Sequence, residues 1–202
     1  MVARTVYENT AQRVAIFVDV QNMFYSAKTL HQSKIDYRKL LEEILKGRQL
    51  VRATAYVVQK ADVDQSAFLE ALRRSGYEVK GKELTIRDDG TSKGDWKVEI
   101  ALDAVALGAR MDCMVLVSGD GDFVPLLRTL DAHGCRTEVV SFEQSTSNDL
   151  MRVCHQFIPI EQDVLFKEEK FIRQERERRS ANESQQQSGS SEYSGSYPHG
   201  NR

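Results

Sequence analysis

The sequence predicts an α/β protein in which helices cover both faces of a mainly parallel sheet. Short runs of apolar and β-branched residues alternate with segments of helical spacing along most of the 202 residues. The run over residues 14–19 is apolar and β-branched, which is typical of a strand buried on both faces; residues 50–58 form the next predicted strand, and residues 113–119 a buried one. Because strand and helix alternate, we expect parallel strands joined by right-handed helical connections.

The first half of the chain is expected to supply three strands and three helices. Apolar residues at helical spacing predict helices over residues 22–31, 36–47 and 64–76. Asp36 can cap the second of these helices, and Gly76 can end the third. The stretch 77–86 is more polar than the other strands, so it is predicted to be one edge strand, followed by a loop over 88–94.

The second half repeats the alternation. The same patterns predict helices over residues 95–109, 122–134 and 147–155, and strands over residues 113–119, 136–142 and 156–160. Pro125 falls in the first turn of its helix, where a missing N–H has no intrahelical partner to lose.

The composition changes after Ile160. Residues 161–180 are dense in mixed charge and are expected to form a solvated helix with i,i+4 ion pairs. Residues 181–202 are rich in Ser, Gln and Gly and are expected to be disordered. We therefore expect one folded domain over 12–160, followed by a helical extension and a tail.

Charge and cysteine content restrict the function classes. The net charge of −2 gives no sign of a general coat for nucleic acid, so an anionic partner would need a local basic patch or a metal. Three widely spaced cysteines indicate neither a disulfide framework nor a zinc site, and are expected to be reduced. The first residues are too polar for a signal peptide, and no apolar run is long enough to cross a bilayer. We expect a cytoplasmic protein with no membrane partner.

Acidic residues follow two of the predicted buried strands. Asp19 ends the strand 14–19, and Asp120 and Asp122 come directly after the strand 113–119. Because the carboxyl ends of parallel strands meet at one edge of a sheet, these side chains are expected to converge. Taken singly, Asp122 can cap the following helix and Asp19 can stabilise a turn.

A third source of acids is the predicted helix 95–109. Asp95, Glu99 and Asp103 recur every four residues and therefore share one face, which lies between two apolar groups. Taken alone, this stripe is more typical of a solvated face. Clustered carboxylates need counter-charge, which Mg²⁺ or Mn²⁺ supplies. The chemistry that such a centre predicts is metal-assisted hydrolysis of a phosphodiester bond.

Other nucleotide-binding motifs are absent from the sequence. The segment "SGDGD" is neither a Walker loop nor a helix-opening G-x-G-x-x-G pattern. The four histidines show no ligand spacing. A dinucleotide site is therefore poorly supported.

Three segments together carry a family resemblance. "VAIFVDVQNMF", "KGDWKVEIALDAV" and "VLVSGDGDFVPLLRTLDAHG" resemble the NYN domain family, and more narrowly its LabA-like branch, over residues 12–160. The resemblance implies a PIN-like Rossmannoid fold, which is a three-layer sandwich with an acidic metal site. It also implies Mg²⁺- or Mn²⁺-dependent cleavage of RNA.

The resemblance assigns roles to particular residues. Asp19, Asp120 and Asp122 match the family acids, and Ser118 matches the serine before them. Asn22 matches an asparagine that would orient a water or a phosphate. With Asp95 and Asp103 from the helix, the three acids would form the metal site.

One position departs from the family pattern. Many members carry an aspartate where this chain has Lys97. A lysine cannot ligate Mg²⁺, so either Asp95 or Glu99 takes that role, or the site is weakened.

The substrate side of the site is less specific. Lys93 and Lys97, or Arg87, can hold the RNA backbone through their charges. Ser147 and Asn148 lie past the last long strand, where the family often has polar residues near the site, although a plain helix cap is the slightly favoured explanation for them. We expect single-stranded RNA, because a cleft at a sheet edge admits a splayed strand more easily than a duplex.

Two rival functions remain open at this point. The acidic cleft can belong to a non-catalytic RNA-binding or regulatory module, with the helix 161–180 used for partner contact or for a homodimer. It can also serve a phosphatase or nucleotide hydrolase that uses the same metal chemistry on a small substrate.

Overall fold

The computed structural model describes residues 9–59, 63–83, 85–86, 92–93 and 95–166. The sheet and the helices that cover it lie within residues 1–165. The predicted extension and tail over 161–202 lie almost entirely outside the described residues, apart from a short 3₁₀ helix, η3 (Gln162–Val164), that follows the last strand.

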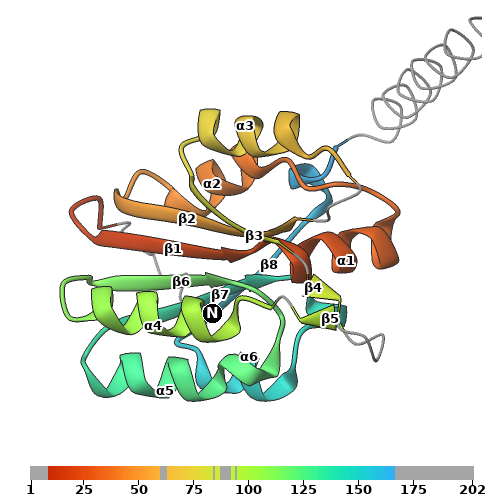
Figure 1. Ribbon diagram of the computed structural model, residues 1–202. Helices are drawn as coiled ribbons and strands as arrows, with labels where there is room; N and C mark the ends of the chain where they lie inside the picture. Colours follow the sequence, from red (N-terminus) through yellow and green to blue (C-terminus); the bar gives the residue numbers. More distant parts are fainter. Residues whose placement is uncertain (1–8, 60–62, 84, 87–91, 94, 167–202) are drawn as a thin grey trace, which may run out of the picture. The chain divides into compact units, whose positions relative to one another are not determined.

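Six parallel strands form the central sheet (Figure 1). They are β1 (Arg13–Asp19), β2 (Gln49–Gln59), β3 (Glu78–Glu83), β6 (Cys113–Val117), β7 (Arg136–Ser141) and β8 (Gln156–Pro159). Their order across the sheet is β3-β2-β1-β6-β7-β8, and every neighbouring pair is parallel. The chain winds outward from β1 in one direction and then returns to β6, so the winding reverses between these two central strands.

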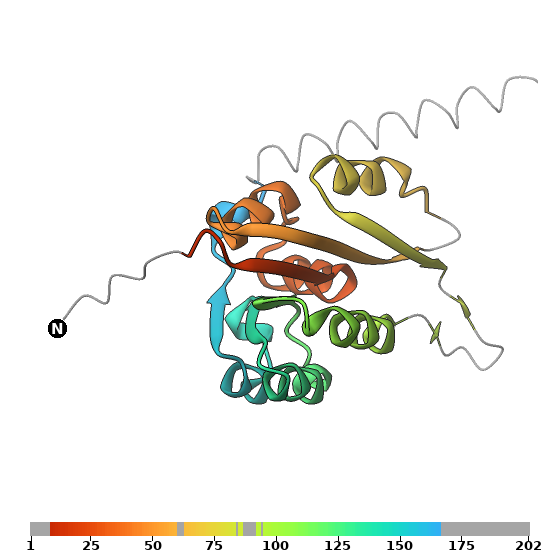
Figure 2. The same cartoon turned by 90° about the vertical axis from the view of Figure 1, so that its left-hand side faces the viewer.

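Helices cover both faces of the sheet. They are α1 (Val20–His31), α2 (Tyr37–Leu45), α3 (Ser66–Arg74), α4 (Lys97–Gly108), α5 (Val124–Ala132) and α6 (Asn148–Val153). The first three pack on one face and the last three on the other, with one apolar core in each interface. Figure 2 shows the same two helical layers on either side of the strands. The three-layer α/β fold predicted from the sequence is confirmed.

Strand β1 shows why the sequence folds this way. Its side chains alternate between the two cores: Val14, Ile16 and Val18 enter one, and Ala15 and Phe17 enter the other. All five are at most 1% exposed. A strand buried on both faces cannot alternate polar with apolar residues, which explains its continuous apolar run.

The stretch predicted as one edge strand over 77–86 is divided. Strand β3 is the edge of the main sheet, and its pairing with β2 ends at the Gln59–Glu83 pair, where β2 itself ends. Beyond that point, β4 (Thr85–Ile86) pairs with β5 (Ser92–Lys93) as a separate antiparallel ribbon. The segment 88–94, predicted as a loop, therefore contains two paired residues.

The other elements match their predicted positions within a few residues. Asp36 caps α2, since its carboxylate accepts the backbone N–H groups of Arg38 and Lys39. The helix predicted over 122–134 begins with a 3₁₀ turn, η1 (Gly121–Phe123). None of the helices in the described part of the chain has the length and apolar character needed to span a lipid bilayer.

Candidate functional site

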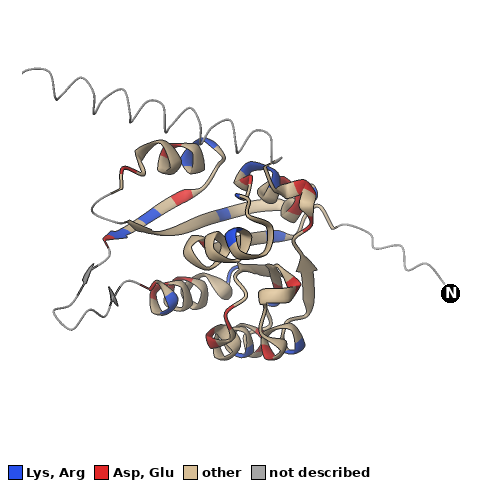
Figure 3. Cartoon of the chain, turned by 90° about the vertical axis from the view of Figure 1, so that its right-hand side faces the viewer, with Lys and Arg blue, Asp and Glu red and all other residues tan. Residues whose placement is uncertain are grey.

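The carboxyl ends of β1 and β6 lie side by side at the point where the winding reverses. Ligand sites of open parallel sheets lie at such points. Asp19 is the last residue of β1, and the segment from Ser118 to Asp122 follows β6 directly. Figure 3 views this edge, with α1 and the acidic segment after β6 facing the reader.

Asp19 is a buried carboxylate. It caps α1, because its Oδ1 accepts the backbone N–H of Asn22 at 3.1 Å, and it is 9% exposed. Burial raises the pKa of Asp19 above its ordinary value, and the like charge of Asp120 raises it further, while Lys97 acts in the opposite direction. Asp120 and Lys97, which follow β6 and begin α4, therefore act electrostatically on the carboxylate at the end of β1.

Asn22 joins the two strand ends. Its Oδ1 accepts the backbone N–H of Gly119 at 3.0 Å. The amide oxygen that was expected to orient a water or a phosphate therefore holds the start of α1 against the segment after β6. Asn22 positions Asp19 and that segment relative to each other.

Lys97 lies between Asp120 and Asp122. Its Nζ is 2.7 Å from Asp120 Oδ2 and 2.6 Å from Asp122 Oδ2. The hydrogen bond to Asp120, together with the one to Asp122, raises the pKa of Lys97. Lys97 stands where many members of the family it resembles carry an aspartate. Its ammonium is a built-in counter-ion for Asp120 and Asp122, two of the predicted metal ligands.

The cap of the following helical turn is Asp120 and not Asp122. Asp120 accepts the backbone N–H of Asp122 at 3.0 Å and precedes η1. Its own backbone N–H donates to Ser118 Oγ at 3.3 Å. The side chain of Asp122 is 71% exposed, which leaves it at the solvent side of the site.

The acidic stripe of α4 faces elsewhere. Glu99 Oε1 accepts a hydrogen bond from Lys82 Nζ on β3 at 2.6 Å, and the same ammonium donates to the backbone carbonyl of Asp95. Lys97 lies two residues before Glu99, which is about 200° around a helix. On one side of α4, Lys97 therefore contacts Asp120, while on the other side Glu99 contacts Lys82 of β3.

Asp103 lies one turn further along the stripe. Its Oδ2 accepts hydrogen bonds from Tyr56 Oη and Lys80 Nζ, each at 2.6 Å. Burial raises the pKa of Asp103, but the bonds from Lys80 and Tyr56 outweigh it, and the net pKa is below the usual value. Asp103 is thus engaged with β2 and β3.

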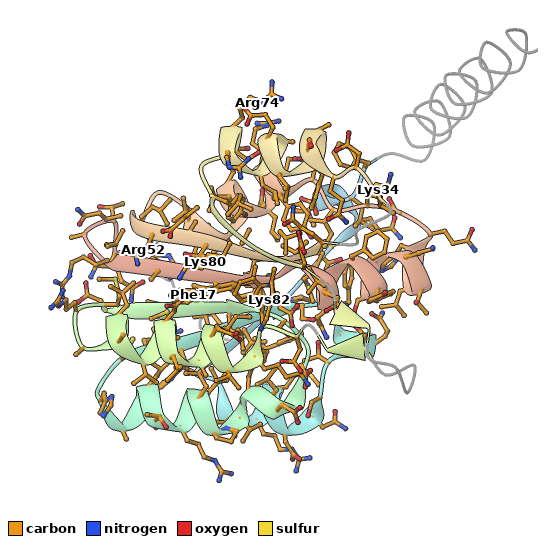
Figure 4. All side chains as sticks on the ribbon, viewed as in Figure 1. Phe17, Lys34, Arg52, Arg74, Lys80 and Lys82 are labelled. Atoms are coloured by element: carbon orange, nitrogen blue, oxygen red, sulfur yellow. The ribbon has the colours of Figure 1, made fainter. Side chains whose placement is uncertain are left out.

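The predicted convergence of all these acids on one centre is not observed. Among the described residues, no three or more His, Cys, Asp or Glu side chains are grouped so that they could hold a metal ion. The acids divide into Asp19, Asp120 and Asp122 at the strand ends, and Glu99 and Asp103 beside β3. Figure 4 labels Lys80 and Lys82 at the second location.

This second location was missed by the sequence reasoning, although the sequence carries a signal for it. Lys80 and Lys82 alternate along a strand, so they point to the same side and lie about 6.7 Å apart. Glu99 and Asp103, four residues apart in a helix, are separated by about 6 Å. The two spacings match, which favours a pair of ion bridges between β3 and α4.

Gly119 is a further residue that the sequence reasoning missed. A Cβ at this position would lie 2.7 Å from the carbonyl oxygen of Ser145 and 3.1 Å from the Cα of Thr146. Only glycine allows the two backbones to approach in this way. The backbone N–H of Ser147 also donates to the carbonyl of Gly119 at 2.9 Å.

The remaining predicted substrate residues have varied surroundings. Ser118 is fully buried. Ser147 precedes α6 without a side-chain cap bond. Asn148 is exposed in the first turn of α6. The side chain of Lys93 lies outside the described residues, as does Arg87.

The sequence of this chain matches the model of the NYN domain over residues 13–161. The chain belongs to the NYN domain family. Members of this family are in general ribonucleases.

Individual relatives place this NYN domain in the LabA-like branch. It is 31% identical over 156 residues to the low amplitude and bright protein LabA of Synechococcus elongatus, covering 73% of this chain and 83% of that protein. An uncharacterized protein of Methanocaldococcus jannaschii is 26% identical over 168 residues. This match covers 82% of the chain but only 62% of the archaeal protein.

A solved structure supports the fold. The crystal structure of a protein of unknown function from Vibrio parahaemolyticus superposes with a TM-score of 0.72 at 34% identity. The match covers 78% of this chain and 98% of the Vibrio protein. The PIN-like fold expected of an NYN domain is therefore shared along the matched region.

Proposed function

We propose that this NYN domain hydrolyses phosphodiester bonds of RNA with the help of a divalent cation, Mg²⁺ or Mn²⁺, held by Asp19 and Asp120. The observation that carries this proposal is the placement of two carboxylates at the ends of the adjacent strands β1 and β6, one of them, Asp19, buried with a raised pKa. A buried carboxylate beside a second one is costly unless a cation neutralises it. Membership of a family of ribonucleases supports the choice of RNA as substrate.

The residues present fit a cation that needs few protein ligands. Mg²⁺ is commonly bound by one or two carboxylates and keeps several waters, which Asp19 and Asp120 can satisfy. They do not fit a centre built from all five predicted acids, because Asp103 is engaged by Lys80 and Tyr56. When bound, such a cation would lower the pKa of a water and offset charge on a phosphate oxygen.

The residues of the chain have distinct tasks in this proposal. The cap bond to Asn22 holds Asp19 in one orientation, and the Asn22–Gly119 bond holds the segment that carries Asp120. Lys97 places an ammonium group between Asp120 and the exposed Asp122. Two of its three N–H groups point to these carboxylates, which leaves the third for a phosphate that enters from the solvent side.

The cellular setting proposed for this reaction is the cytoplasm. The described cysteines, Cys113, Cys135 and Cys154, are all free thiols. Free thiols are typical of a reducing compartment.

A second candidate is an RNA-binding module that does not cleave. It is favoured by Lys97, whose ammonium already neutralises Asp120, one of the two carboxylates that the metal would use, and the neighbouring Asp122. In that case the site would bind RNA, and divalent cations would have no effect on the RNA.

Cleavage of an end-labelled single-stranded RNA separates the two candidates. We expect the purified wild type to cleave it with Mn²⁺ and not with EDTA. Asp120→Asn keeps an oxygen for the Asp122 N–H, so it should fold normally and lose at least about 100-fold in rate, as expected for a metal-stabilised transition state. The control is Asp131→Asn, an exposed aspartate on α5.

Two results would contradict the proposal. The first is a wild type that binds the RNA and leaves it intact with either metal, which supports the second candidate. The second is equal cleavage by wild type and Asp120→Asn.

A further inference from the structure

Helix α1, which begins after Asp19 of the candidate site, exposes two aromatic rings. Phe24 is 43% exposed and Tyr25 is 49% exposed. Their ring centroids are 5.5 Å apart in an edge-to-face arrangement, and Lys28 Nζ lies 5.9 Å from the Phe24 centroid. Large exposed aromatic side chains of this kind contribute nothing to either core, which invites an explanation.

The rings continue the site along the helix. Asn22 is bonded to Gly119 in the site, and Tyr25 lies three residues later, about 4.5 Å along the helix axis and on the same side. Phe24 lies two residues after Asn22, about 200° around the helix, and Lys28 follows Phe24 at i+4, so both lie on the opposite flank of α1 from Asn22. The contact between the Tyr25 and Phe24 rings therefore continues the surface from the flank of Asn22 across the exposed face of α1 to Lys28.

The charge of this helix suits a polyanion. Helix α1 contains Lys28 and His31 in its last turn and has no acidic residue. In Figure 3 its ribbon carries blue and no red, unlike the neighbouring start of α4. A nucleic-acid strand that reaches Asp120 would therefore meet no negative side chain along α1.

We propose that Phe24, Tyr25 and Lys28 form a stacking platform for single-stranded RNA, on which one or two bases next to the reacting phosphate rest. Bases stack on aromatic side chains with little sequence preference, and lysine contacts the phosphates between them. The platform gives the site a preference for unpaired RNA, since paired bases have no free faces. This inference rests on the proposed function, and it specifies which part of the substrate the protein holds.

Binding of a fluorescent 12-nucleotide single-stranded RNA in EDTA tests the platform without cleavage. The variant Phe24→Leu/Tyr25→Leu keeps apolar side chains and removes both rings. We expect it to bind about 10- to 100-fold more weakly than wild type, as is typical for the loss of base–aromatic stacking. The matched control is Val51→Ala, which alters a 45% exposed apolar residue in β2.

An RNA with two adjacent abasic positions makes the test specific for bases. Wild type should bind the intact RNA more tightly than the abasic RNA by about the same factor, whereas the double leucine variant should not distinguish the two. Equal binding of intact RNA by wild type and variant would overturn the platform. So would a wild type that binds neither RNA, or a variant that still prefers intact RNA.

The outcomes also separate this inference from the proposed function. Stacking without Mn²⁺-dependent cleavage would keep the platform and remove the nuclease. Cleavage that is unaffected by the loss of both rings would keep the nuclease and remove the platform. If the leucine variant instead changes the oligomeric state at unchanged RNA affinity, the rings contact a second protein chain and the platform is rejected.

Discussion

The two ends of the parallel strands differ in how their acidic side chains are paired. We call the end at which the strands begin the amino edge of the sheet, and the end at which they finish the carboxyl edge. At the amino edge, Arg48 donates to both oxygens of Glu138 at 3.1 and 3.0 Å, and Arg136 donates to the same carboxylate at 3.1 Å. Arg13 and Asp112 form a second two-bond pair nearby. At this edge, Glu138 is therefore paired with two arginines and Asp112 with one.

At the carboxyl edge, Asp19 is not paired with arginines in this way within the described residues. Burial raises the pKa of Glu138, but Arg48 and Arg136 outweigh it and the net pKa is lowered. Burial raises the pKa of Asp19, and there the net shift stays upward. Since a lowered carboxylate pKa stabilises the fold at neutral pH and a raised one opposes it, the amino edge serves stability. The carboxyl edge retains an electrostatic conflict that a bound cation would relieve.

The largest expected effect is on the amino edge. Glu138→Gln leaves the guanidinium of Arg48, which is 11% exposed, without its carboxylate. Breaking a buried pair from one side costs about 3 kcal/mol or more, so urea unfolding should show a loss of about that size. In the exposed Arg38–Glu42 pair, Glu42→Gln should cost less than about 1 kcal/mol. Equal losses would remove the distinction between buried and exposed pairs.

Gly119→Ala addresses the packing of the carboxyl edge. The added Cβ would meet backbone atoms of residues 145 and 146. Overpacking of this kind typically lowers the free energy of unfolding by about 1–3 kcal/mol. Gly121→Ala would meet Ser147 Oγ at 2.8 Å, which can rotate away, and Ser147 Cβ at 3.1 Å, but no backbone atom, so thermal unfolding should show a smaller loss. A Gly119→Ala variant as stable as wild type would show that the close approach of the two backbones does not require glycine.

Lys97→Met removes the built-in counter-ion. A unit charge about 4 Å away contributes about 1–4 kcal/mol near a protein surface, so we expect Mn²⁺ to bind about tenfold more tightly to this variant. Titration followed by Mn²⁺ electron paramagnetic resonance measures the change. Unchanged or weaker Mn²⁺ binding would mean that Lys97 and the cation do not compete.

Asp19→Asn should give the smallest effect, with a sign opposite to that of Glu138→Gln. The amide oxygen keeps the α1 cap while the buried charge is removed, so stability at pH 7 should rise by about 0.5–2 kcal/mol. Because the folded pKa of Asp19 is raised, the gain should vanish as pH falls below the ordinary aspartate value of about 4.

The Glu138 contribution follows the opposite pH dependence. Because its folded pKa is lowered, its contribution is present at neutral pH and is lost as pH falls below the ordinary glutamate value of about 4.3. Unfolding of both variants at pH 4 and pH 7 checks the two trends. An Asp19→Asn variant that is less stable than wild type at pH 7 would contradict the conclusion that the buried charge of Asp19 destabilises the fold.

Local patterns made much of the fold predictable. The continuous apolar run of β1 indicates burial on both faces, and the polar stretch with Lys80 and Lys82 indicates an edge. The placement of Asp19 and Asp120 at one edge follows from parallel topology, which strand–helix alternation already predicts. None of these inferences requires knowledge of which side chains touch.

The contacts that divide the acids were not predictable in the same way. Asp103 is held by Tyr56 and Lys80, which are 47 and 23 residues away in the sequence, and the rotation of α4 that turns Lys97 toward Asp120 depends on the packing of its other faces. Such nonlocal contacts arise from tertiary packing, which residue spacing does not specify.

Calorimetric titration of Mn²⁺ into wild type and Asp19→Asn tests the central claim most directly, that the buried carboxylate at the end of β1 forms a cation site with Asp120. The account predicts saturable binding of Mn²⁺ to wild type that is lost in Asp19→Asn, although the variant remains folded. Binding of equal strength to both proteins, or none to wild type, would contradict it.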